Sequence, residues 1–257
     1  MTPATAADRA EIEAFLDRDL TRAMFPRANL DSYGMAGGHR LSMRFWVSRA
    51  AGRIDGVLGT TEEGMILPVL PNGAEGVAEA LAGRPAIGVI GPPDQVQAIL
   101  DATGLDPAPR VLDRVEPHFL LDLADLRVPE GPGLLAPFEE LGEETALAWL
   151  CDYNFATLGL PPEEARQRAA RTLATVRGTG SHAILIDGIR PLSMTGCNAA
   201  LPSIVQVGGV YTPPAYRSRG HARRAVALHL ALARDGGVGQ ATLFASGPPA
   251  VRAYEAI

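Results

Sequence analysis

Four arginines gather at the start of a predicted helix near the end of the chain. Arg217, Arg219, Arg223 and Arg224 lie within a stretch of eight residues. A helix N-terminus carries the positive end of the helix dipole, so bases there are disfavoured by about 0.3–1 kcal/mol each unless an anion is bound. Repeated exceptions to this preference indicate a site for an anion such as a phosphate. The alternative is a solvated, arginine-rich helix start.

The elements around these arginines can be read from the apolar pattern. Residues 205–212 predict a strand, Pro213 and Pro214 predict a turn, and an amphipathic helix follows from about Arg219 until the glycines at 236 and 237. The pair Gly208-Gly209 interrupts the strand and predicts a β-bulge, with a tolerated bend as the alternative. A strand, a Gly-containing turn and a helix start together form a geometry that suits a phosphate.

The segment Arg217-Ser-Arg-Gly220-His-Ala222 resembles the (Arg/Gln)-x-x-Gly-x-(Gly/Ala) signature of the GNAT superfamily of acyl-CoA-dependent N-acetyltransferases. Its setting strengthens the resemblance, because a strand precedes it and a helix follows it. A second strand at 240–245 and a short helix containing Tyr254 then resemble the next motif of the family, in which a Tyr lies near the cofactor sulfur. The detailed resemblance covers residues 203–257, and a looser one reaches back to residue 134.

The resemblance implies that acetyl-CoA is the co-substrate and that a primary amine of a small molecule or peptide is the acceptor. A bulge at Gly208-Gly209 would splay this strand from the next one, so that the pantetheine arm bonds along the strand and the pyrophosphate meets the helix start. The side chain of His221 is interpreted as packing. The implied cofactor-binding residues are Val210, Tyr211 and Thr212 for the arm, and Arg217, Ser218, Arg219, Gly220, His221, Ala222 and Arg223 for the pyrophosphate.

Tyr254 is the candidate catalytic residue, although without the family motif it would be read as a core aromatic. A phenol with a pKa of about 10 stays protonated at neutral pH and can donate to the departing thiolate. The general base stays open, because Gln206 stands near the place where some relatives carry a Glu. A water held by Gln206 or by a backbone carbonyl is one option, and Asp152 or Glu163 is another. Cys197 is only a weak candidate for a covalent relay of the acetyl group, because a buried Cys more commonly has a structural role.

Two features depart from the family pattern. Gly247 stands where relatives often carry an Asn, which puts one usual cofactor contact in doubt. The sequence stops at Ile257, where relatives continue with two further strands that help to build the acceptor pocket. We therefore expect the second half to lack its last strands.

The expected fold class is α/β (α+β), with two GNAT-like halves in which a mixed, mostly antiparallel sheet is flanked by helices. The order of predicted elements in the first half partly repeats in the second, and the Pro- and Gly-rich stretch 128–133 predicts the boundary. We expect a degenerate N-terminal domain over 1–130 and a catalytic domain over 131–257, with a cofactor cleft between its splayed fourth and fifth strands. The stretch 88–91 also suits a phosphate but has no Arg, so we expect no coenzyme A in the first half.

Individual elements follow from periodicity and turn signals. In the first half these are a capping box at Thr5–Asp8, a helix up to Pro26, a loop at 27–40, strands at 42–48, 54–60, 64–70 and 86–90, and a helix at 92–103. The run 118–123 is read as a strand pairing between the halves. The second half is expected to hold a strand at 134–139, a helix at 143–158 with Leu147, Leu150, Cys151, Phe155 and Leu158 inward, a second helix after Pro162, and a hairpin of 183–186 with 191–198.

Composition bounds the function classes. The net charge of −6 and pI near 5.4 argue against nucleic-acid binding, although every one of the 23 Lys and Arg residues is Arg. Two cysteines form no disulfide framework, and no Cys/His cluster has metal-ligand spacing. No signal or membrane-spanning pattern is present, so a cytoplasmic location without a membrane partner is expected. A non-catalytic acyl-CoA-binding regulator or scaffold is the alternative function, and the oligomeric state stays open.

Overall fold

The computed structural model describes residues 1–257, and the chain divides into two compact units, Met1–Pro109 and Arg110–Ile257. The predicted boundary at 130/131 therefore lies inside the second unit. The reason is the strand β6 (His118–Asp122), which pairs along its whole length with β11 (Gln240–Phe244) of the second sheet. This strand does not pair between the halves.

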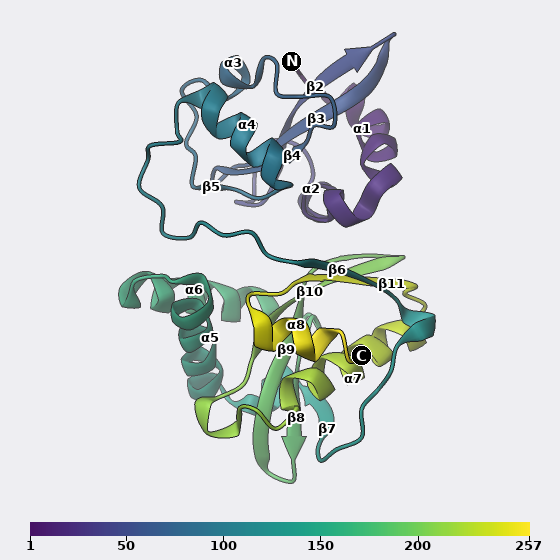
Figure 1. The fold of residues 1–257 in the computed structure, drawn as a ribbon, viewed down its shortest axis with the longest axis vertical. Coiled ribbons are helices and arrows are strands. Elements are labelled where there is room, and N and C mark those ends of the chain that lie inside the picture. Colours follow the sequence, from purple (N-terminus) through teal and green to yellow (C-terminus); the bar gives the residue numbers. More distant parts are fainter. The chain divides into compact units, whose positions relative to one another are not determined.

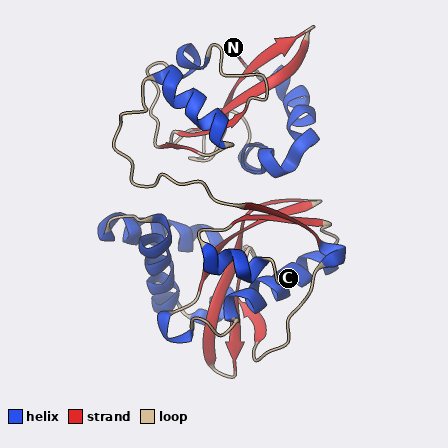
Figure 2. Cartoon of the chain, in the orientation of Figure 1, coloured by secondary structure: helices blue, strands red, loops and turns tan.

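The first unit is a five-stranded sheet with helices on both faces (Figures 1 and 2). Its strand order is β1-β2-β3-β4-β5, antiparallel except for the last pair, in which β4 and β5 run parallel. Its elements are β1 (Thr2–Pro3), α1 (Arg9–Leu16), α2 (Leu20–Tyr33), β2 (Met43–Ala50), β3 (Arg53–Thr61), β4 (Met65–Val69), α3 (Val77–Leu81), β5 (Gly88–Val89) and α4 (Pro93–Thr103).

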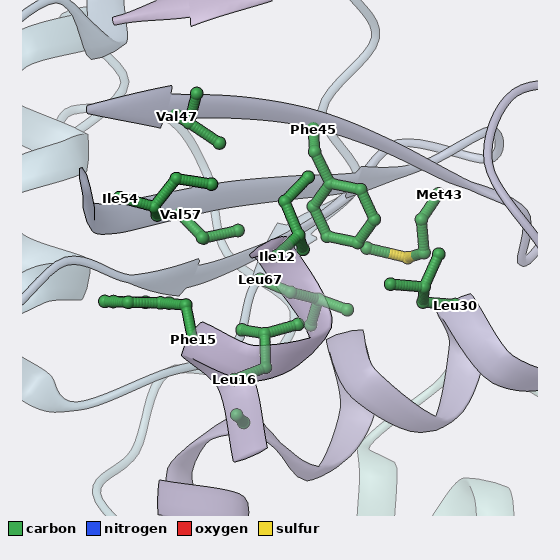
Figure 3. Close-up of a cluster of buried hydrophobic side chains, with 11 residues drawn as sticks. Ile12, Phe15, Leu16, Leu30, Met43, Phe45, Val47, Ile54, Val57 and Leu67 are labelled. Carbon is green, nitrogen blue, oxygen red and sulfur yellow. The ribbon is translucent and has the colours of Figure 1, made fainter. Parts of the chain in front are cut away.

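One face of this sheet buries its core against α1 and α2. Figure 3 shows Ile12, Phe15 and Leu16 of α1 meeting side chains from the three central strands. The predicted loop at 27–40 was wrong for its first part, because α2 continues through Pro26 to Tyr33. Burial of Ala28 and of Leu30, which is 0% exposed, outweighs the backbone hydrogen bond that Pro26 removes. The capping box at Thr5 and Asp8 is present, as predicted.

The second unit is a six-stranded sheet of order β6-β11-β10-β9-β8-β7, in which only β10 and β11 run parallel. The mixed, mostly antiparallel sheet predicted for each half is confirmed, and each contains one parallel pair joined through a helix. The remaining elements are β7 (Leu134–Pro137), α5 (Glu143–Leu158), α6 (Pro162–Val176), β8 (His182–Asp187), β9 (Arg190–Leu201), β10 (Ile204–Tyr211), α7 (His221–Asp235) and α8 (Pro248–Tyr254).

Helices cover both faces of this second sheet. On one face α5 and α6 pack over Ile184, Met194 and Tyr211, and on the other α7 and α8 pack over the centre of β10 and β11. The predicted inward face of α5 was partly wrong, because Phe155 is 58% exposed whereas Trp149 and Asn154 are buried. Asn154 is buried because its side-chain amide donates to the carbonyl of Ala165 on α6, at 3.1 Å.

The outer edge of β11 is occupied by β6, which comes before every other strand of this sheet in the chain. His118 stacks on Phe244 at the end of this pair, with 4.4 Å between ring centroids. The edge position beside β11 is thus filled by a strand that the sequence reading placed elsewhere. No helix in either unit combines the length and apolar character needed to span a membrane.

Candidate functional site

The strands β10 and β11 separate beyond their first four residue pairs. They are paired from Ile204–Gln240 to Val207–Leu243, after which β10 continues to Tyr211 on β9 alone. The register of β10 against β9 shifts on both sides of Val207 and Gly208, and Gly209 has a φ of +63°. The predicted bulge and the splayed strand pair are therefore present.

Two side chains from the neighbouring strands explain why glycines stand at the bulge. A Cβ placed on Gly208 would lie 1.9 Å from Nδ2 of Asn198, and one on Gly209 would lie 3.1 Å from Nε2 of His182. The ring of His182 also fills the space above Gly196, where a Cβ would lie 2.4 Å from it. A positive φ and two close neighbours together require small residues at this place.

Backbone groups of β10 beyond the bulge face the space between the strands. The carbonyl of Tyr211 accepts from Oγ of Ser193 on β9, at 2.9 Å, which places the groups of Tyr211 on the β9 side. Alternate residues of a strand direct their backbone groups to opposite neighbours. The N–H and C=O of Val210 therefore point toward the side that β11 has left, where an extended ligand can bond as an added strand.

The turn after β10 ends in an open helix start. Ser218 has a φ of +60° and Gly220, the N-cap of α7, has a φ of +80°, and no side chain caps the helix. The carbonyl of Gly220 accepts the N–H of Arg224, at 3.0 Å. The N–H groups of His221, Ala222 and Arg223 have no intrahelical partner by geometry, so they are directed at one point outside the helix.

The arginines of this segment differ in their partners. Arg224 donates to the carbonyls of Pro129, Pro132 and Gly133, and so fastens the loop before β7 to the helix. Arg217 donates from Nε to the carbonyl of Thr212 at 2.9 Å, and its guanidinium lies 5.9 Å from the ring centre of Tyr211.

Arg223 differs from both of these arginines. Its Nε is buried and has no hydrogen-bond partner, and a terminal nitrogen lies 3.5 Å from the Cβ position of Gly220. A buried guanidinium N–H without an acceptor at an open helix start favours a site for an anionic ligand.

Tyr211 belongs to a polar contact with α5. Its hydroxyl donates to Oδ2 of Asp152 at 2.8 Å, and its ring lies against Trp149, with 5.8 Å between centroids. Burial and the bond to Asp152 raise the pKa of Tyr211 to about 12. Asp152, one of the candidate bases, is therefore engaged with this phenol on the face covered by α5.

Tyr254 lies on α8 and packs, together with Val210, against the core on the α7 side of the sheet. Burial raises the pKa of Tyr254 far above its ordinary value, and the nearby Tyr153 and Glu116 raise it further. Burial also raises the pKa of Tyr153, from α5, while the backbone of Gly209 at the bulge acts in the opposite direction. The two phenols come from helices on opposite faces of the sheet.

Tyr153 and Glu116 were not identified from the sequence. Neither lies in a motif, and their proximity depends on contacts between distant segments. The other candidates have different surroundings. Gln206 is buried, with Oε1 lacking a hydrogen-bond partner. Glu163 is 68% exposed and paired with Arg166 on its own helix, and burial raises the pKa of Cys197 to about 11, which keeps it a thiol.

The counterpart of this site in the first unit has a shorter strand pair and a shorter helix. There β4 and β5 share only two residue pairs, and the joining helix α3 has five residues and no Arg. The side chain of Gln95 accepts the backbone N–H of Leu70 at 2.8 Å, and Pro68 lies 2.8 Å from the Cβ position of Gly91. Met1 also lies against Gly76, the N-cap of α3.

Comparison with solved structures places this fold. A Drosophila protein from structural genomics superposes with a TM-score of 0.60 at 10% identity, covering 94% of this chain and 88% of its own. A tandem GNAT protein from the clavulanic acid biosynthesis pathway gives a TM-score of 0.51 at 16% identity, with coverage of 99% and 93%. A GCN5-related glucosamine N-acetyltransferase region of a fungal β-N-acetylglucosaminidase gives 0.50 at 14%, covering 93% of this chain and 34% of that one.

No protein-family model matches the chain, and no curated protein matches it either. The structural likeness is to GNAT acetyltransferases, a tandem member among them, which agrees with the resemblance seen at Arg217–Ala222. The chain has the GNAT fold in two halves, each a mixed sheet flanked by helices.

Proposed function

We propose that the second unit transfers an acetyl group from acetyl-CoA to a primary amine. The observation that carries this proposal is the alignment of the strand splay at Gly209 with the open helix start at Gly220. An extended arm with a phosphate at one end fits a strand edge that leads into a set of free N–H groups. The unpartnered Nε of Arg223 supports an anion at that end.

The residues that would hold acetyl-CoA follow from this geometry. The backbone from Val210 to Thr212 would take the pantetheine amides, and the segment from Arg217 to Arg223 would take the pyrophosphate. Of the arginines, Arg223 is best placed for direct charge pairing, since Arg217 and Arg224 already donate to backbone carbonyls. His221 is buried, with the pKa lowered by burial and by Arg219, which supports a packing role for its ring.

The chemistry that the chain would perform is proton transfer and positioning. Bound acetyl-CoA supplies an acetyl group activated as a thioester. Tyr254 is protonated at neutral pH because burial raises its pKa, so it can donate a proton to a departing thiolate. The backbone of β10 would position the bound arm so that its thioester approaches Tyr254, which would remove much of the entropic cost of the reaction.

A non-catalytic acyl-CoA-binding protein is the second candidate, favoured by Gln206 and Gly247 at places where relatives carry functional residues. Incubation of the protein with acetyl-CoA and a panel of primary amines, followed by thiol release and mass of the products, separates the two. Thiol release that depends on an amine and yields its acetyl derivative supports the enzyme. Binding of acetyl-CoA without any turnover supports the binding protein, and no binding contradicts both. We expect the protein in the cytoplasm, which cell fractionation would test.

A further inference from the structure

The segment 110–117, which leads into β6, is fastened on both sides of the strand splay. At one end Arg114 donates from Nη2 to the carbonyl of Thr157, in the last turn of α5, at 2.9 Å. At the other end the carbonyl of Pro117 accepts the N–H of Ala245, just beyond β11, at 3.0 Å. Since α5 contacts β10 and Ala245 follows β11, the segment connects the two sides of the opening.

This crossing brings one carboxylate to the site. Glu116 is 23% exposed at its side chain, and its Oε1 is buried without a hydrogen-bond partner. Nη2 of Arg114 lies 2.6 Å from that oxygen in an ion pair, and the same nitrogen donates to the carbonyl of Thr157. A buried carboxylate oxygen that lacks a donor can accept one from a ligand.

The surroundings of Glu116 join it to the proposed reaction centre. Glu116 directly precedes Pro117, whose carbonyl accepts the N–H of Ala245 just beyond β11. The charge of Glu116 acts on Tyr153 of α5 and on Tyr254 of α8. The carboxylate therefore lies on the segment that crosses the opening, on the side of the proposed proton donor.

We propose that Glu116 binds the ammonium group of the acceptor and accepts its proton, a role that rests on the proposed acetyl transfer. The acceptor class is then a primary amine that arrives as an ammonium ion. Asp152 meets this need less well because it accepts from the hydroxyl of Tyr211, and Glu163 because its side chain is 68% exposed on α6. The amide of Gln206 cannot accept a proton.

The proton balance requires two groups. Glu116 takes one proton from R–NH3⁺ and becomes a carboxylic acid, which leaves a neutral amine with a lone pair. The C–N bond forms as the C–S bond breaks, and Tyr254 gives its phenolic proton to the sulfur. The second nitrogen proton then passes to the phenolate of Tyr254, and Glu116 releases its proton to solvent. The net products are the acetylamide, the free thiol and one proton.

The test measures amine binding, so that it does not depend on turnover. Butylammonium, 2-phenylethylammonium and putrescine are titrated by saturation-transfer NMR at pH 7, with and without coenzyme A. We expect at least one to bind the wild type, and Glu116→Gln to weaken it roughly ten- to a hundred-fold, the usual effect of losing a charged hydrogen bond. Glu143→Gln is the matched control, because it removes the same charge from an exposed carboxylate that is paired with Arg177, and it should leave binding unchanged.

Activity and folding supply the remaining readouts. Glu116→Gln should lower acetylation of the bound probe by roughly 10²–10⁴-fold. Glu116→Asp, which keeps the charge, should retain probe binding even if folding of the Gln variant is impaired. Equal probe affinity in the wild type and Glu116→Gln, or no probe binding to the wild type, would overturn the proposal. Failure of the wild type to bind acetyl-CoA contradicts the proposed transfer instead, and the titrations without coenzyme A still test Glu116.

Discussion

His182 should make the stability of the second unit fall in acid. Its ring is buried above Gly196 and beside Gly209, with Nδ1 3.0 Å from Oγ of Ser181. Burial, aided by the nearby His229, lowers the pKa of His182 from 6.5 to about 4. Between these two pH values the unfolded chain binds a proton that the folded chain does not. Stability is therefore present in full above pH 6.5 and is lost as the pH falls toward 4.

The size of the effect follows from the same two values. A fall in pKa from 6.5 to about 4 corresponds to roughly 3 kcal/mol, at about 1.4 kcal/mol for each pH unit. His229 and His221, whose pKa values burial also lowers, add to the acid sensitivity in the same direction. His182→Gln should remove the share of His182 and leave theirs.

The measurement is urea unfolding between pH 4 and 8, followed by tryptophan fluorescence. A Trp46→Phe background leaves Trp149 as the reporter, and Trp149 packs against Tyr211 in the second unit. We expect the free energy of unfolding of the parent to rise with pH more steeply than that of the His182→Gln variant, by up to about 1.4 kcal/mol for each pH unit. His39→Gln, at an exposed histidine of the first unit, should leave the slope unchanged. Parallel slopes for the parent and His182→Gln would show that His182 does not cause the acid sensitivity.

Three further substitutions test single parts of the site. Gly209→Ala places a Cβ at φ +63° and 3.1 Å from Nε2 of His182, so it should lower the urea midpoint by the equivalent of about 1–3 kcal/mol; an unchanged midpoint would argue against the bulge. Tyr254→Phe should leave the calorimetric affinity for acetyl-CoA unchanged and slow thiol release roughly 10²–10⁴-fold, whereas equal rates would exclude the phenol as the proton donor. Arg224→Met should lower stability by about 1–3 kcal/mol through lost bonds to the 129–133 loop and leave acetyl-CoA affinity unchanged; tighter or weaker binding would place Arg224 at the ligand.

Local signals explain why the strand, bulge, turn and helix of 205–224 could be predicted from the sequence. An apolar run, two adjacent glycines, two prolines and an amphipathic run each act over a few residues. These local signals do not distinguish the roles of the four arginines. Their different roles depend on long-range partners, such as the Pro132 carbonyl for Arg224, which no local pattern encodes.

The parts of the site that the sequence did not reveal depend on pairing between distant segments. Glu116 approaches Tyr153 and Tyr254 only because β6 pairs with β11, more than a hundred residues later in the chain. The same pairing places the boundary between the units after Pro109, not at the predicted 130/131. The sequence of a single apolar strand does not indicate which sheet the strand joins. On α5, Asn154 is buried and Phe155 is exposed, the reverse of what their polarity indicates. The interior accepts the polar side chain because its amide donates to the carbonyl of Ala165.

Calorimetric titration of acetyl-CoA against two arginine variants of α7 tests whether the start of this helix binds the pyrophosphate. Arg223→Gln removes a guanidinium whose Nε is buried without a hydrogen-bond partner at the start of α7, and Arg234→Gln removes the same charge from the exposed last turn, where it pairs with Asp235. We expect the wild type to bind acetyl-CoA, Arg223→Gln to weaken binding roughly ten- to a hundred-fold, and Arg234→Gln to leave it unchanged. Absence of binding to the wild type, or equal affinities for the two variants, would contradict a pyrophosphate site at this helix start.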